Sequence, residues 1–170
     1  MAVSVIGNDR PGIVAGVTRS LFESGCNLED VSSTILRGHF SMVLIVRAPG
    51  SLDPAELESS LADAVADLDL VVTVRPVDDV VTEVAAPTHM VSVYGADQPG
   101  IVFRVAQGLA DAGANVTDLT SRVIGDPAEP VYALMLEVSA PEADLEEVLA
   151  SLRKDLGLDA SVHPIEADVL

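Results

Sequence analysis

The sequence has 170 residues, of which 49% are hydrophobic, and 27 acidic against 9 basic residues give it a formal net charge of −18. The hydrophobic content excludes a disordered chain, and the shortage of Lys and Arg argues against direct binding of nucleic acid, whose phosphates need clustered basic residues. No apolar run approaches the roughly 18 residues that cross a bilayer, and the N-terminus does not match a secretory signal. We therefore expect a cytoplasmic protein that has no membrane partner.

The first half of the chain alternates strand and helix patterns. Apolar residues at helical spacing follow Pro11 and Pro54, and Gly25 is a suitable stop for the first of these helices. Gly38 predicts a tight turn between two apolar strands, because glycine adopts a positive φ without strain. The order is typical of the α+β ferredoxin-like βαββαβ domain. The expected elements are a strand at 2–6, a helix from Pro11, strands at 31–36 and 40–46, a helix from Pro54 and a strand at 70–74.

The second half repeats the first at a shift of 88 residues, so that Gly100 corresponds to Gly12. An internal repeat of this length predicts two domains, which we place at 1–77 and 89–170 with a linker at 78–88. The register slips at 125–130, where we expect a hairpin loop four residues longer than its counterpart in the first half. The elements expected after it are a strand at 131–138, a helix from Pro141 and a strand at 160–165, with a frayed tail after Glu166.

One stretch occurs in both halves. Residues 5–14 and residues 93–102 each carry a short apolar run, a Gly and then Asp-x-Pro-Gly-Ile-Val. We expect the apolar run to be a strand and the Pro to start a helix. The loop between them then lies at a helix N-terminus, whose unpaired N–H groups can bind a carboxylate or a phosphate. This duplicated loop is the ligand site that the sequence predicts most clearly.

In the functional interpretation of these loops, N–H groups near Gly12 and Gly100 bind the carboxylate of an amino acid, and Asp9 or Asp97 meets its ammonium group. The alternative is structural: each Asp caps its own helix, and each Gly lets helix and strand pack closely. A capping residue can also line a ligand site, so the residues alone leave both interpretations open. The candidate ligand-binding residues of the two loops are Asn8, Asp9, Arg10, Pro11, Gly12 and Ile13, and Asp97, Gln98, Pro99, Gly100 and Ile101.

Four more candidates lie where the second strand of each half is expected to begin: Asn27, Asp30, Asn115 and Asp118. In the functional interpretation they lie near the same domain interface as the loops and hydrogen-bond the ligand; the alternative is ordinary turn chemistry after a helix. We favour turn chemistry for the two Asn residues and leave the two Asp residues open. The strand itself lies at a sheet edge in this topology, and we expect that edge to dock another domain or chain, giving a homo-oligomer.

The residues predict neither catalysis nor a metal site. Cys26 corresponds to Ala114 in the second half, so a reactive thiol is not expected. The three histidines have no Cys or carboxylate at metal-ligand spacing. No recognisable nucleophile motif and no phosphate-binding loop of the GxxxxGK type occurs. We therefore expect a protein that is not an enzyme and that has no cofactor and no metal.

Two halves of this kind resemble the ACT domain family of amino-acid-sensing modules. The resemblance covers essentially the whole chain, and it is strongest to the double-ACT proteins related to the glycine cleavage system transcriptional repressor. The matching segments are residues 8–14, 27–30 and 36–42 in the first half, and 97–102, 115–119 and 130–134 in the second.

The resemblance implies two ACT domains packed with their sheets side by side as one eight-stranded sheet, and small ligands bound at ACT–ACT interfaces. It also implies a regulator that senses a small amino acid, such as glycine, and acts on transcription through a DNA-binding protein partner. The alternative is a regulatory subunit that docks on an enzyme of amino-acid metabolism. Gln98 and Ala96 replace Arg10 and Asn8 at the matching positions, so we expect two inequivalent ligand sites.

Overall fold

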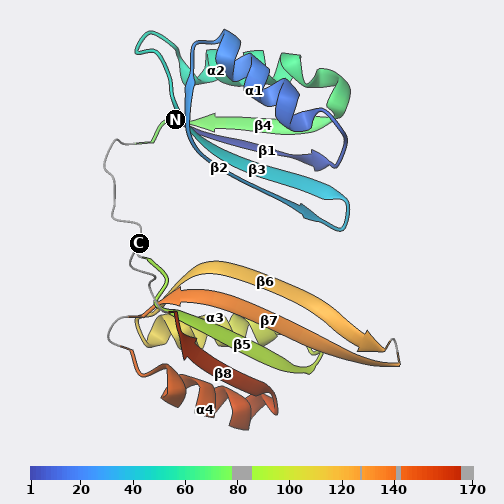
Figure 1. Ribbon diagram of the computed structural model, residues 1–170, viewed down its shortest axis with the longest axis vertical. Coiled ribbons are helices and arrows are strands. Elements are labelled where there is room, and N and C mark those ends of the chain that lie inside the picture. The colour runs from blue at the N-terminus through green and yellow to red at the C-terminus, as the bar shows by residue number, and fades with distance from the viewer. Residues whose placement is uncertain (78–85, 127, 141–142, 166–170) are drawn as a thin grey trace. The chain divides into compact units, whose positions relative to one another are not determined.

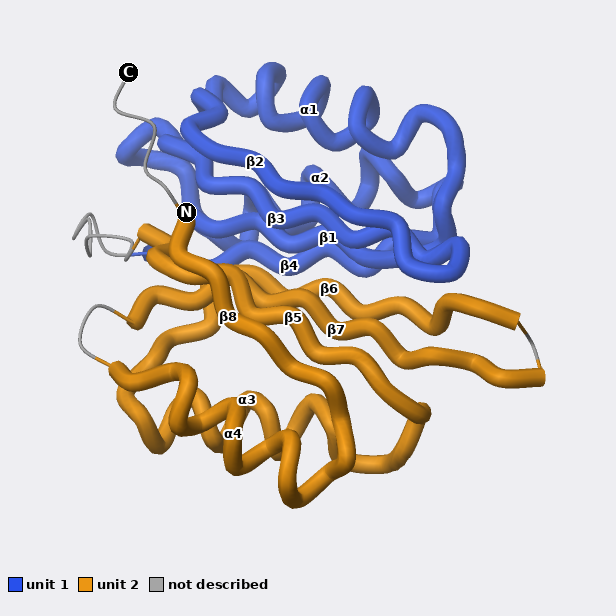
Figure 2. The backbone as a smooth tube through the Cα atoms, turned by 60° about the horizontal axis from the view of Figure 1, so that its bottom comes forward, with its two compact units in different colours: residues 1–81 blue, residues 82–170 orange. Residues whose placement is uncertain are grey.

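The computed structural model describes residues 1–77, 86–126, 128–140 and 143–165. The chain divides into two compact units, Met1–Val81 and Thr82–Leu170 (Figure 2). Each unit has the element order βαββαβ and one four-stranded sheet, which confirms the predicted α+β ferredoxin-like fold. The packing of the two sheets side by side stays a prediction.

The first unit places two helices against one face of an antiparallel sheet with strand order β2-β3-β1-β4 (Figure 1). The strands β3 and β1 are therefore central, and β2 and β4 form the edges. Its elements are β1 (Ala2–Asn8), α1 (Ile13–Glu23), β2 (Asn27–Leu36), β3 (His39–Arg47), α2 (Pro54–Ala64), a short 3-10 turn (Ala66–Leu68) and β4 (Leu70–Arg75).

The second unit has the same topology, with antiparallel strand order β6-β7-β5-β8 and two helices on one face of the sheet (Figure 1). The repeat in the sequence is therefore a repeat of the fold. Its elements are β5 (His89–Ala96), α3 (Ile101–Asp111), β6 (Asn115–Asp126), β7 (Glu129–Ser139), α4 (Leu145–Leu156) and β8 (Asp159–Pro164).

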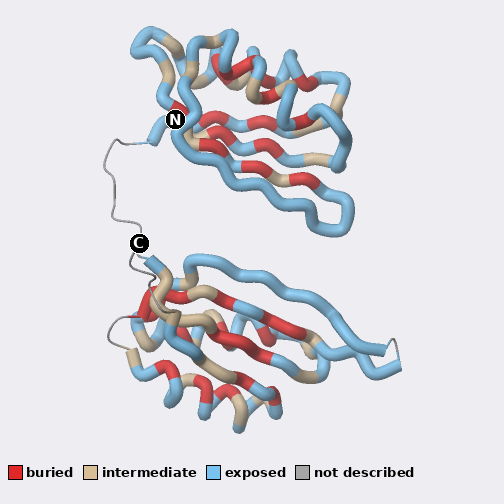
Figure 3. The backbone as a smooth tube through the Cα atoms, in the orientation of Figure 1, coloured by how far each residue is buried: buried red, intermediate tan, exposed pale blue. Residues whose placement is uncertain are grey.

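Each unit has its own hydrophobic core between the helices and one face of its sheet. Strand residues alternate between this covered face and an open face: Met42 and Leu44 on β3 are buried, whereas Val43 between them is 46% exposed. In α1 the side chains at every fourth position, Ile13, Val17 and Leu21, are buried. Figure 3 shows the resulting alternation of buried and exposed residues along the central strands.

Two predicted helix starts were wrong by two residues. α1 and α3 begin at Ile13 and Ile101, because Gly12 and Gly100 have φ angles of 97° and 90° and are left-handed residues just outside the helices. The Pro-Gly pair is therefore a turn before the helix rather than its first turn. In consequence Ile13 enters the core, whereas Val14 is 48% exposed.

The predicted difference between the two hairpins was also wrong. The additional residues of the second hairpin lengthen its strands: β6 and β7 have 12 and 11 residues, against 10 and 9 in β2 and β3. Gly125 pairs with Pro130 and Asp126 with Glu129 in the ladder, although we expected a loop there. Proline is tolerated at this position because it lies at the beginning of its strand.

Some predictions fall on residues outside the described ranges. The linker at 78–88 does so for residues 78–85, and Pro141 and the tail after Glu166 do so entirely. The predicted start of the fourth helix was wrong: α4 begins at Leu145, where the Asp144 side chain accepts a hydrogen bond from the Glu147 N–H. Thr88, at the end of the predicted linker, donates its backbone N–H to Val138 and accepts from the Ala140 N–H through its hydroxyl.

Gly7 is the glycine of the first unit at which two backbone segments come closest. A Cβ at this position would lie 2.8 Å from the Asp69 carbonyl oxygen and 2.7 Å from Leu70 Cδ2. Because a backbone atom cannot move aside as a side chain does, we expect Gly7→Ala to lower the free energy of unfolding by about 1–3 kcal/mol. Gly50→Ala is the matched control, since a Cβ there meets nothing within 4 Å. Urea unfolding measures both, and equal stability of the two variants would contradict the close approach.

Candidate functional site

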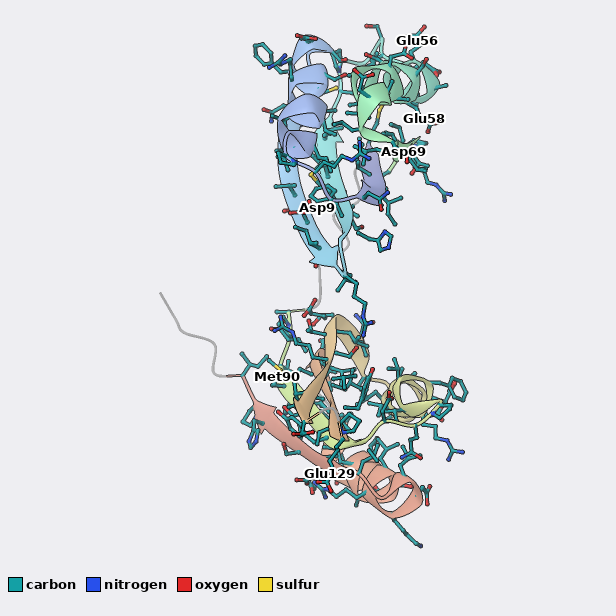
Figure 4. All side chains as sticks on the ribbon, turned by 90° about the vertical axis from the view of Figure 1, so that its right-hand side faces the viewer. Asp9, Glu56, Glu58, Asp69, Met90 and Glu129 are labelled. Atoms are coloured by element: carbon teal, nitrogen blue, oxygen red, sulfur yellow. The ribbon has the colours of Figure 1, made fainter. Side chains whose placement is uncertain are left out.

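The loop between β1 and α1, residues 9–12, lies on the surface, where Asp9 is exposed (Figure 4). The backbone N–H of Asp9 donates to the Gly38 carbonyl at 2.8 Å, which ties the loop to the tip of the β2–β3 hairpin. The first hydrogen bond of the helix runs from the Gly16 N–H to the Gly12 carbonyl at 2.8 Å. The loop is thus fixed at both ends by backbone hydrogen bonds, while its side chains remain accessible.

The N-termini of α1 and α3 are uncapped. Among the described residues, no side chain accepts a hydrogen bond from the first turn of either helix. The structural interpretation in which Asp9 and Asp97 cap their own helices is therefore wrong. The N–H groups of the first turn stay available to an external acceptor, and the helix dipole favours an anionic one.

The second structural interpretation fails as well. A Cβ on Gly12 or on Gly100 would meet nothing within 4 Å, so these glycines do not serve close helix–strand packing. Their left-handed φ angles explain the residue type instead. The close approaches occur at the preceding glycines, Gly7 and Gly95, whose Cβ atoms would clash with Leu70 and Leu158 respectively.

Residues near the first loop differ in charge from those near the second. Arg10 belongs to the first loop, and Arg37 lies in the hairpin turn next to Gly38, to which Asp9 is bonded. Sequence reasoning missed Arg37, although the pairing of Asn8 with His39 brings the turn to the end of β1. Asp69 lies at the same end of this unit as Asp9 (Figure 4).

The second loop has no equivalent cations. Gln98 occupies the position of Arg10, and its Nε2 donates to the Leu156 carbonyl at the end of α4 over 3.0 Å. The strand ends that extend past this loop carry acidic side chains, Asp126 and Glu129. The side chains around the two loops therefore differ in charge, and the inequivalence of two ligand sites stays a prediction.

Asn27 and Asp30 do not lie with the loop of their own unit. They are residues of β2 and pair with Arg47 and Ile45, whereas the loop follows Asn8, which pairs with His39. Six residues along β3 separate His39 from Ile45, which corresponds to roughly 20 Å at about 3.4 Å per residue. The structure thus places the two candidate sets at opposite ends of the first sheet.

Asp30 has a local role. It lies at a β-bulge in β2, and its Oδ1 accepts a hydrogen bond from the Val31 N–H at 2.8 Å. The bulge recurs in the second unit, where it lies between Val116 and Asp118. The turn chemistry that we favoured for the two Asn residues is replaced by strand pairing, since Asn115 pairs with Ser139 as Asn27 pairs with Arg47.

The second strand of each unit is an edge strand, as predicted. All ten residues of β2 are exposed, and β6 is exposed along almost its whole length (Figure 3). Several of the exposed side chains are apolar, among them Val31 and Ile35 on β2 and Leu119 and Val123 on β6. Docking of these edges on another domain or chain stays a prediction.

The remaining features to consider are the one cysteine, clusters of metal-binding side chains and long apolar helices. Burial raises the pKa of the Cys26 thiol above its ordinary value, so the thiol stays protonated near neutral pH and is a poor nucleophile. In the described ranges, no three His, Cys, Asp or Glu side chains come together as a metal site would require. None of the helices in the described part of the chain has the length and apolar content of a membrane span.

Comparisons with known proteins agree with this architecture. Residues 1–75 and residues 89–157 each match a sequence model of the ACT domain. The chain is 28% identical to the glycine cleavage system transcriptional repressor of Escherichia coli (strain K12), over 97% of this chain and 90% of that protein. It is 29% identical to phosphoserine phosphatase SerB2 of Mycobacterium tuberculosis, over 89% of this chain but 37% of that protein. A crystal structure of an unknown protein from Galdieria sulphuraria is similar, with a TM-score of 0.79 and 26% identity over 97% of both chains.

Two ferredoxin-like domains in tandem, each with an uncapped helix at the same loop, are the architecture to which both ACT-domain matches correspond. The chain belongs to the ACT domain family and contains two ACT domains. It is a regulatory ACT-domain protein related to the glycine cleavage system transcriptional repressor, and this relationship indicates a role without catalysis.

Proposed function

We propose that this protein senses a small amino acid, glycine or one of similar size, at its Asp-x-Pro-Gly loops. One observation carries the proposal: the first turns of α1 and α3 are uncapped behind exposed, glycine-containing loops. The amino-acid carboxylate binds the free N–H groups near Ile13 and Ile101, and the ammonium group meets Asp9 or Asp97.

The two loops bind with different strength in this proposal. Arg10 and Arg37 add positive charge near the first loop, whereas Gln98 is engaged with the Leu156 carbonyl. The first loop is therefore the tighter carboxylate site. Asn27, Asp30, Asn115 and Asp118 lie too far along their own sheets to complete it, so they contribute only where another ACT surface brings them to a loop.

The output passes to a protein partner. Control of transcription through a DNA-binding protein fits the relationship to the Escherichia coli repressor, and a chain of net charge −18 is poorly suited to bind DNA itself. The amino acid changes the affinity of this protein for its partner only as far as it binds the partner-bound protein and the free protein with different affinities. The protein acts in the cytoplasm as a homo-oligomer, without cofactor or metal, with domains at 1–77 and 89–170.

A second candidate is a regulatory subunit docked on an enzyme of amino-acid metabolism. The exposed edge strands β2 and β6 favour it, because an unpaired edge can add a strand from another protein. Affinity capture from cells followed by mass spectrometry separates the two candidates. A transcription factor supports the first and a metabolic enzyme supports the second.

Thermal unfolding across a panel of the twenty amino acids tests the sensing proposal. A ligand that binds the native state raises the free energy of unfolding, by about 2.7 kcal/mol when its concentration is 100 times its dissociation constant. The unfolding temperature therefore rises with ligand concentration. We expect the smallest amino acids to stabilise the protein and the large aromatic ones to have no effect. Unchanged unfolding temperatures with all twenty would contradict the sensing proposal.

A further inference from the structure

The open face of the second sheet has no helix over it. We call it the second open face and define it by Met90, Tyr94, Asp118, Arg122, Met135 and Glu137, which the strand register places on the same side. These side chains line a hollow of about 410 Å³ together with Thr120, Ile124 and Ala133. The surface therefore combines a concave apolar floor with charged groups along β6 and β7.

The apolar floor is exposed to solvent in the described chain. Met135 and Ile124 are 43% and 47% exposed, and Tyr94 is 37% exposed. They are neighbours rather than scattered residues, since Tyr94 pairs with Ala133 and Ile124 with Val131 on the strands that carry Met135. A contiguous exposed apolar surface with a polar rim is typical of an interaction site, and methionines adapt to the shape of a partner.

Among the described residues, the charged side chains of this face form no ion pair within the unit. Asp118 and Glu137 lie directly opposite each other on β6 and β7, an arrangement of like charges that destabilises a sheet. Within the described residues the ion pairs are Arg47 with Glu29 and Arg153 with Glu146, so neither acid is in one. Arg122 lies on the same strand and face as Asp118, four residues and roughly 13 Å away.

This pattern is self-complementary. Thr120 and Met135 pair with each other midway between the acidic pair and Arg122. A two-fold axis that lies above this pair, parallel to the sheet and perpendicular to the strands, would place Arg122 of one copy against Asp118 and Glu137 of the other, and the reverse, as an isologous contact requires. The first sheet lacks the pattern, because Thr34 and Ile45 hold the positions that correspond to Arg122 and Glu137.

We propose that the second open face binds the second open face of another copy of this chain. The three strands that carry these residues, over five or six residues each, about 4.8 Å apart with about 3.4 Å per residue, present roughly 270 Å² per copy and roughly 540 Å² in total. Stable interfaces bury roughly 1,200–2,000 Å², so this contact is a weak dimer that forms and dissociates with concentration. Salt weakens it, because its ion pairs remain near solvent.

Sedimentation velocity of the full chain, from about 10 µM to about 1 mM, tests the proposal over the range expected for a weak dimer. We expect a monomer–dimer equilibrium in which Arg122→Glu raises the dissociation constant about tenfold or more, because it places an acid against two acids. Arg104→Glu is the matched control: Arg104 is an exposed arginine of α3 in the same unit, away from the open face. Its dissociation constant should equal that of the wild type.

A charge-reversal variant separates a direct contact from an indirect effect on folding. Arg122→Glu combined with Glu137→Arg restores opposite charges across the two-fold axis, and its dissociation constant should return to within about threefold of the wild type. A wild type that stays monomeric at every concentration overturns the proposal, including the case in which another part of the same chain covers this face. A dimer that Arg122→Glu and Arg104→Glu weaken equally, or a double variant that does not recover, overturns it as well.

Discussion

Gly12→Val is expected to abolish amino-acid binding at the first loop while the protein still folds. The φ of Gly12 is 97°, a conformation that a β-branched residue adopts only with strain of about 1–3 kcal/mol. A Cβ there meets nothing within 4 Å, so the added side chain causes no core clash. It does place an isopropyl group beside the first N–H groups of α1, where the carboxylate is proposed to bind. Isothermal titration calorimetry with the stabilising amino acid should show at least a tenfold loss of affinity.

Gly113→Val supplies the matched control for this substitution. Gly113 has a φ of 78° and also has nothing within 4 Å of a Cβ, but it follows the end of α3 rather than preceding a helix. Its variant carries similar backbone strain and should bind the ligand as the wild type does. Gly100→Val tests the second loop in the same way. Unchanged affinity in both Gly12→Val and Gly100→Val would remove the loops as the ligand site.

The topology of this chain could be predicted because the sequence patterns that indicate each strand and helix are local, and because they occur in both halves. Apolar runs of four to six residues bounded by Gly and Pro gave strands, and apolar side chains at every third or fourth position gave helices. The element order then leaves few sheet topologies, and it places β2 and β6 at edges. Because the motif occurs in both halves, the elements predicted in one half could be checked against those predicted in the other.

The beginnings of the helices could not be predicted in the same way. Pro is common at the first helical position, so Pro11 and Pro99 suggested helix starts there. The following Gly in a left-handed conformation moves the start to Ile13 and Ile101, and no pattern of hydrophobicity reports that dihedral angle. This shift matters for the proposed ligand site, because it leaves the helix N-terminus without a capping side chain.

The composition of the candidate site was predicted in part. The loop residues were found because they repeat, but Arg37 was missed because it reaches the loop only through the pairing of β1 with β3. Asn27 and Asp30 were expected at the same interface as the loop, and the same pairing, followed one strand further, places them at the other end of their own sheet. Both results depend on long-range register, which the sequence does not state residue by residue.

The second large effect is expected from Leu136→Ala, which should lower the free energy of unfolding of the second unit by about 2–5 kcal/mol. Leu136 is 1% exposed on the central strand β7 and belongs to the core formed with α3 and α4. A small domain has a total stability near the lower end of about 5–15 kcal/mol, so the loss is a large part of it. Urea unfolding monitored by circular dichroism measures the change.

Met135→Ala is the neighbouring control, and it tests more than stability. Met135 precedes Leu136 on β7 but points to the open face, where it is 43% exposed. Below the concentration at which dimers form, its truncation removes little buried surface and should cost less than about 1 kcal/mol. If Met135→Ala were as destabilising as Leu136→Ala, the alternation of β7 would be misassigned. The surface proposed for dimerisation would then lie in the core, so this pair of variants tests the register on which both the fold and the second open face depend.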